Sequence, residues 1–229
     1  MHHGGKRAGA GRKRKGRPCG AHRARPFHDA RLPVHVVLRV ISEVGRLRRR
    51  RAYQAMRWAL LRSLCRHDFR VVHLSIQGNH VHLLCEADDR KALANGVRAL
   101  CISAARRLNL AVTVESGTPR RGQVFSDRYH ATTITGPRQA RHALAYVLNN
   151  WRRHKDDRAA FARRPAAVDP YSSAVWFTGW RERDGVPFAW PKGYEPLPVA
   201  RPQTWLLAQG WKRGGAPPSL WQVPGPLHA

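Results

Sequence analysis

The order in which the apolar residues change their spacing is the feature that most constrains the fold of this chain. From residue 34 to residue 41 they alternate with a period of two, which indicates a strand whose core face carries Val34, Val36, Leu38 and Val40. Similar patterns predict further strands over residues 70–76, 81–86, 111–114 and 129–135. Spacings of three and four residues predict helices over residues 53–66, 91–108 and 137–154.

With the short 111–114 segment set aside, the elements follow the order β-α-β-β-α-β-α, which favours a ferredoxin-like (RRM-like) α+β fold. In that arrangement, helices cover one face of an antiparallel sheet. We expect this domain to occupy residues 32–164, after a basic flexible arm at 1–31. A Trp/Pro-rich C-terminal extension at 165–229 follows, with eleven of the 16 prolines and six of the 8 tryptophans. It either wraps the domain with its aromatic residues or forms an accessory DNA surface.

Positive charge dominates the composition. The chain has 42 Lys and Arg against 14 Asp and Glu, a formal net charge of +28. This imbalance favours a polyanionic partner, nucleic acid above an anionic membrane surface. In the arm, the residues expected to contact phosphates are Arg12, Lys13, Arg14, Lys15 and Arg17. The Lys15–Pro18 stretch also resembles the core of an AT-hook, with a solvated charge run as the alternative.

The remaining composition argues for a cytoplasmic, nucleoid-associated protein. No apolar run approaches the roughly 20 residues that span a bilayer, and the basic N-terminus lacks the apolar stretch of an export signal. The four cysteines show no CxxC pair, which favours a reduced compartment.

Two histidines in the predicted hairpin are candidate metal ligands. Residues i and i+2 of a strand share a face, so His80 and His82 stand side by side and can bind one divalent cation. The alternative is a pair of hydrated surface histidines. The same parity puts His35 and Arg39 on this non-core face, together with His73 and Ser75, a composition suited to binding phosphate.

The last predicted helix supplies a candidate nucleophile. At 100° per residue, Tyr146 lies about 130° from the centre of the apolar arc, so the alternative of a core tyrosine is disfavoured. Asn150 is one turn further on and faces the same point. Arg153 lies on the same side and, like His35 and Arg39, is expected to contact the DNA. A phenol, an amide oxygen and two imidazoles can then converge on one metal ion and one phosphate.

These residues resemble a known family. Asn79-His80-Val81-His82-Leu83-Leu84 resembles the HUH motif (His, bulky hydrophobe, His) of single-tyrosine transposases of insertion sequences, and most of all that of REP-associated tyrosine transposases. The 146–150 segment, Tyr-Val-Leu-Asn-Asn, is similar to the family's catalytic-tyrosine helix, and 128–130, Arg-Tyr-His, also resembles the family. One departure is Trp151, where many relatives have proline.

The resemblance implies a metal-dependent transposase and endonuclease that cleaves and rejoins single-stranded DNA, and the expected substrate contains a hairpin. Tyr146 would attack phosphorus to give a 5′-phosphotyrosine and a free 3′-hydroxyl. His80, His82 and Asn150 would bind Mg²⁺ or Mn²⁺, while Arg153 and other basic residues favour the phenolate. His142, one turn before the tyrosine, is a candidate proton acceptor. Whether the protein is a monomer or a homodimer stays open.

Two other classes of function fit parts of the pattern. A domesticated transposase would bind structured DNA without cutting it, but the residues needed for cutting, His80, His82 and Tyr146, are all present. An RNA-binding module of the RRM type would carry paired aromatic residues on its open sheet face, where this chain has His and Arg. The cutting enzyme is therefore the favoured hypothesis.

Overall fold

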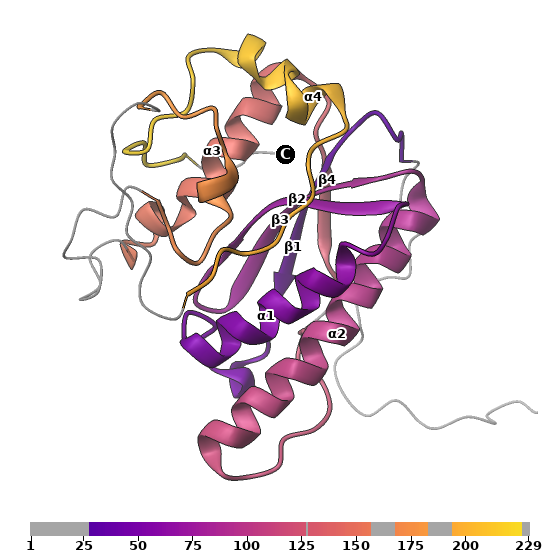
Figure 1. Ribbon diagram of the computed structural model, residues 1–229, viewed down its shortest axis with the longest axis vertical. Coiled ribbons are helices and arrows are strands. Elements are labelled where there is room, and N and C mark those ends of the chain that lie inside the picture. The colour runs from indigo at the N-terminus through magenta and orange to yellow at the C-terminus, as the bar shows by residue number, and fades with distance from the viewer. Residues whose placement is uncertain (1–27, 127, 157–167, 183–193, 226–229) are drawn as a thin grey trace, which may run out of the picture.

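The computed structural model describes residues 28–126, 128–156, 168–182 and 194–225 (Figure 1). Its centre is a four-stranded antiparallel sheet in the order β2-β3-β1-β4. The strands are β1 Val34–Arg39, β2 Phe69–Ile76, β3 His80–Ala87 and β4 His130–Thr133. The predicted α+β fold is confirmed. The five basic residues at positions 12–17 that we expected to contact DNA lie outside the described residues.

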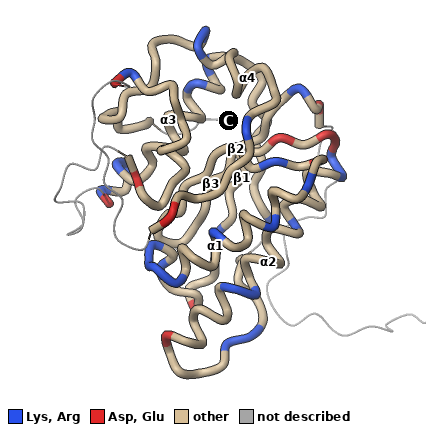
Figure 2. Tube along the Cα trace, in the orientation of Figure 1, with Lys and Arg blue, Asp and Glu red and all other residues tan. Residues whose placement is uncertain are grey.

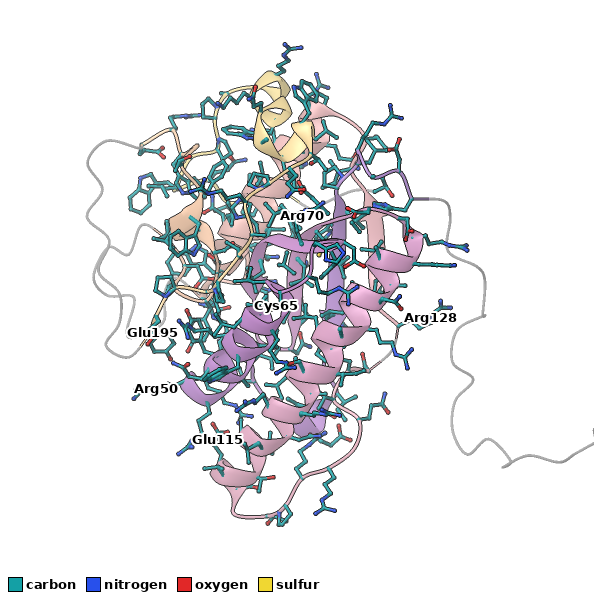
Figure 3. All side chains as sticks on the ribbon, turned by 45° about the vertical axis from the view of Figure 1, so that its right-hand side comes forward. Arg50, Cys65, Arg70, Glu115, Arg128 and Glu195 are labelled. Carbon is teal, nitrogen blue, oxygen red and sulfur yellow. The ribbon has the colours of Figure 1, made fainter. Side chains whose placement is uncertain are left out.

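Helices α1 (Arg50–Ser63) and α2 (Arg90–Ser116) cover one face of the sheet. They run antiparallel, so that Arg50 at the start of α1 and Glu115 near the end of α2 lie at the same end of the pair (Figure 3). Arg49, just before α1, forms an ion pair with Glu115. The alternating residues of β1 pack beneath them, as predicted. Gly96 lets α2 approach β2 closely, because a Cβ at this position would lie 2.1 Å from the ring of Phe69.

The predicted strand over residues 111–114 is wrong, because α2 continues through it. Its side chains Val112, Thr113 and Val114 favour strands, but Ala111 extends the buried stripe of the helix one turn beyond Leu108. The helix ends instead at Gly117, whose φ of 72° is a left-handed conformation favoured by glycine.

The second face of the sheet is also covered, which corrects the expectation of helices over one face only. Helix α3 (Pro137–Arg153) lies across it together with parts of the C-terminal extension (Figure 1). The apolar arc of α3 is buried there because the other face is already occupied by α1 and α2. The second core contains Val72, Leu84, Leu144, Val147, Phe177 and Trp211.

The described parts of the C-terminal extension wrap the domain. Its backbone bonds to the outer edge of β2, where Ile76 N–H donates to the Tyr171 carbonyl at 2.8 Å and Ala200 N–H donates to the Val71 carbonyl at 2.9 Å. The buried carboxylate of Glu86 accepts hydrogen bonds from the backbone N–H groups of Gln203 and Thr204. The extension therefore covers an otherwise unpaired sheet edge. Its short helices are η4 Ala174–Trp176, α4 Trp205–Ala208 and η5 Gly210–Gly214, and η1 Ser42–Val44 follows β1.

No helix in the part of the chain that the structure describes is long and apolar enough to cross a membrane.

Candidate active site between β1, β3 and α3

The two predicted metal ligands point their ring nitrogens at each other. Strand β3 places His80 and His82 on the face covered by α3, with the two Nε2 atoms 3.0 Å apart. The other ring nitrogen of each histidine is also engaged: Nδ1 of His80 lies 2.8 Å from Oδ1 of Asn79, and Nδ1 of His82 lies 3.0 Å from Nε2 of His35. Asn79 and His35 thus hold the two rings so that the Nε2 atoms of His80 and His82 are directed at one point.

This geometry fits a single divalent cation. Two ligands at right angles on an ion with bonds of about 2.1 Å are separated by about 3.0 Å. In His80, Oδ1 of Asn79 can only accept, so Nδ1 carries the proton and Nε2 keeps its lone pair. Among the described residues, no group of three or more His, Cys, Asp and Glu is arranged to hold a metal ion. A third protein ligand would therefore come from another type of residue.

Tyr146 and Asn150 both lie in α3, one helical turn apart, as the sequence predicted. The ring of Tyr146 packs edge-on against His82, with centroids 5.2 Å apart, and one helical turn beyond Asn150 the ring of His154 lies 5.6 Å from that of His80. Asn150 lies between these two contacts along the helix, one turn after Tyr146.

Asn150 is fully buried, and neither its amide oxygen nor its amide nitrogen has a hydrogen-bond partner within the described residues. Leaving a buried polar group unpaired costs about 1–3 kcal/mol, so such groups are usually explained by an ion or a water molecule. The amide of Asn150 therefore has an oxygen and a nitrogen that an ion or a water molecule would satisfy.

Burial keeps these histidines neutral. Desolvation lowers the pKa of His80 and of His35 to about 4, and it lowers the pKa of His82 well below its usual value. The positive charges of His154 and Arg39 lower the pKa of His80 further. At neutral pH the ring nitrogens therefore have lone pairs to offer a cation.

Three predicted DNA-contacting residues have different surroundings in the structure. His35 is buried and its Nε2 is engaged by Nδ1 of His82, so this nitrogen holds the His82 ring rather than contacting DNA. Arg153 is exposed, and its guanidinium donates to the carbonyl of Pro224 at 3.3 Å, so it is directed at the extension rather than at the tyrosine. Arg39 is exposed and pairs with His80 in the β-sheet register, which places its charge at the site.

The predicted phosphate-binding face is not open at β2. His73 and Ser75 are buried under the extension, where His73 bonds to Ser173 at 3.1 Å. The sequence pattern identified the correct face but could not show that the extension covers it.

Sequence reasoning missed His154 and the cavity beside it. A cavity of about 520 Å³ is lined by His80 and His154 together with Ser42, Gly45, Arg46, Gly78, Asn79 and Asp156. The spacing in the sequence could have identified His154, because this residue follows Tyr146 by eight positions and so lies on the same side of the helix.

The comparisons with known proteins assign the class. A sequence model of the family described as "Transposase IS200 like" matches residues 29–150, more than half of the chain. The chain therefore belongs to the IS200-like transposase family, as its motifs indicated. The matched segment contains both histidines, the tyrosine and the asparagine. No curated protein matches the chain.

Two solved structures are similar in fold. One is a REP-associated tyrosine transposase bound to a REP hairpin, with 14% identity and a TM-score of 0.47, covering 76% of this chain and 97% of its own. The other is a protein from Deinococcus radiodurans R1 assigned as a transposase, with 20% identity and a TM-score of 0.36, covering 64% of this chain and 98% of its own.

Proposed function

We propose that this protein is a metal-dependent transposase that cleaves and rejoins single-stranded DNA through a covalent bond to Tyr146. The observation that carries the proposal is the packing of the tyrosine ring, 5.2 Å from His82, beside two imidazoles whose Nε2 atoms meet at 3.0 Å. A nucleophile and a cation site adjacent to one another are what attack on a phosphodiester requires.

His80, His82 and Asn150 would hold Mg²⁺ or Mn²⁺, which would act as a Lewis acid on the scissile phosphate. The neighbouring residues prepare these ligands. Asn79 holds the proton of His80 on Nδ1, and Nε2 of His35 accepts from Nδ1–H of His82 when that ring offers its own Nε2. The contact with Asn79 thereby holds His80 in the tautomer that a metal ligand needs, and the contact with His35 allows the same tautomer in His82.

Tyr146 performs the covalent step. Its phenolic oxygen forms a bond to phosphorus while the bond from phosphorus to the 3′ oxygen breaks, and that oxygen leaves as a 3′-hydroxyl after taking up a proton. The phenolic proton is lost to solvent or to a neighbouring base. Because the phosphotyrosine bond retains the energy of the phosphodiester, attack by a second 3′-hydroxyl joins new ends without ATP.

The proposed substrate is structured single-stranded DNA with a hairpin, in the cytoplasm. Lys and Arg are distributed over both helical layers of the described surface (Figure 2), which suits a strand that extends beyond the cleaved bond. A protein that binds such DNA without cutting is the second candidate.

The test is a search for a covalent protein–DNA band after incubation with hairpin-containing strands and Mn²⁺. The wild type and a Tyr194→Phe control, which removes a phenol from the extension, should both give the adduct. Tyr146→Phe should keep DNA binding and lose the adduct completely. An adduct of normal yield from Tyr146→Phe would eliminate the mechanism, and its absence from the wild type with every strand would favour the binding-only alternative.

A further inference from the structure

A second cavity, of about 730 Å³, lies between β2 and the C-terminal extension. Strand β2 contributes Val72 and His73, and the extension contributes residues between 176 and 212. That wall lies beyond residues 29–150, the part of the chain matched by the transposase family. Most of the residues that line the cavity thus belong to the C-terminal extension, which the family match does not cover.

A buried histidine forms part of this cavity. His73 is 7% exposed, and its Nδ1 lies 3.1 Å from Oγ of Ser173, which also accepts the backbone N–H of Leu74 at 2.9 Å. The ring packs edge-on against Phe177, with centroids 5.8 Å apart. Within the described ranges, no partner is found for Nε2 of His73. The cavity therefore contains a fixed polar group with an unused hydrogen-bonding position.

Aromatic side chains line the wall opposite. Trp176 is 53% exposed, yet its indole N–H donates to the Leu197 carbonyl at 2.8 Å, so an exposed ring is held in one orientation. Trp211 packs against Phe177 with centroids 5.2 Å apart, and Gly179 permits this approach because a Cβ there would lie 2.3 Å from the Trp211 ring. A rigid, exposed indole is a surface on which a flat ring can stack.

The lining is positively charged. Arg201 and Lys212 belong to it, and no acidic residue does. Neither side chain forms an ion pair with a described residue, and Lys212 lies 5.9 Å from the centroid of the Trp211 ring. The charge that would complement this lining is therefore an anion adjoining a flat ring.

We propose that this cavity binds one unpaired nucleotide of the DNA strand, with its base stacked on Trp176 and hydrogen-bonded to His73 and its phosphate at Arg201 and Lys212. Stacking platforms and basic groups of this kind are how single strands are held. The cavity opens on the same face of the sheet as the candidate active site, because Ser75 pairs with His82 in the β2–β3 register and His73 is two residues from Ser75. The proposal deepens the DNA-binding part of the proposed function and does not require cleavage.

The first test measures the affinity of a fluorescent deoxythymidine octamer and of an octamer of abasic residues with the same phosphates. Trp176→Ala should bind the thymidine octamer about tenfold more weakly than the wild type and the abasic octamer equally well. Trp221→Ala is the matched control, because Trp221 is 51% exposed in the same extension but does not line the cavity. Equal affinity of Trp176→Ala and Trp221→Ala for the thymidine octamer would overturn the proposal, provided that thermal unfolding shows both variants folded.

A second test uses the wild type, so it does not depend on a variant that folds. Octamers carrying 5-iodouracil at single positions are irradiated on the protein, and the cross-linked peptide is identified by mass spectrometry. The proposal expects the peptide that contains Trp176. Cross-links that consistently avoid residues 176–179 and 198–212 would overturn it. Because neither test requires the covalent adduct, failure of the cleavage reaction and failure of this site are observed separately.

Discussion

Replacing Asn150 by leucine should separate the cost of its buried amide from its use as a ligand. Both polar atoms of the side chain are buried without a partner among the described residues. Exchanging an unsatisfied amide for an apolar group of similar size removes a penalty of about 1–3 kcal/mol. We therefore expect Asn150→Leu to be more stable than the wild type when a chelator is present. For a chain of this length that gain corresponds to a rise in Tm of about 2–12 °C.

Addition of Mn²⁺ should offset this difference in stability. A ligand that binds only the folded state at 100 times its Kd contributes about 2.7 kcal/mol, so the wild type should gain about 5–10 °C. Asn150→Leu should lose most of that gain, because one of three protein ligands is missing. The measurement is thermal unfolding by circular dichroism with chelator and with a Mn²⁺ titration.

Asn149→Leu is the matched control on the same helix. Its amide nitrogen donates to the Ser219 carbonyl at 2.8 Å, while its amide oxygen has no partner among the described residues. Its replacement breaks that hydrogen bond, so Asn149→Leu should be less stable than Asn150→Leu with chelator while keeping the full Mn²⁺ gain. The reasoning is refuted if Asn150→Leu keeps the full gain, or if it is destabilised with chelator as strongly as Asn149→Leu.

Three further predictions concern stability and binding. Burial lowers the pKa of His35 to about 4. Below about pH 6.5 this histidine is therefore protonated in the unfolded chain but stays neutral in the folded protein until the pH approaches 4. The free energy of unfolding should therefore fall from pH 6.5 to pH 4, and less steeply in His35→Gln, as urea titrations at several pH values would show. Gly96→Ala should cost at least about 1–3 kcal/mol in chemical unfolding, because its Cβ would overlap the Phe69 ring; a neutral effect would contradict the close approach of α2 to β2. Deleting residues 1–27 should weaken DNA binding broadly and flatten its salt dependence by about 0.7 logarithmic units per lost phosphate contact on single strands, without changing the order of preferred hairpins; a changed order would show that the arm reads sequence.

Local periodicity accounts for what could be predicted. The pairing of His80 with His82 follows from the two-residue period of a strand, and the placement of Tyr146 and Asn150 follows from the helical period. Both relations depend only on neighbours along the chain, so no tertiary contact was needed to find them. The failure at 111–114 has the same origin, since β-branched residues favour a strand locally and only packing beside Leu108 made them helical.

The sequence by itself determined the order of the elements, the faces of the individual strands and helices, and the residues that meet within one turn or one hairpin. Tertiary structure decided how those faces are combined. His35 and His82 are 47 residues apart in the chain, and His73 and Ser173 are 100 apart, so their contacts depend on how strands, α3 and the extension pack. The same packing covers the sheet face that was expected to be open. The candidate active site lies on one part of that face, beside β3, and the aromatic cavity lies on another, beside β2. Contacts of this kind come from hydrophobic burial between distant segments, which no short-range pattern records.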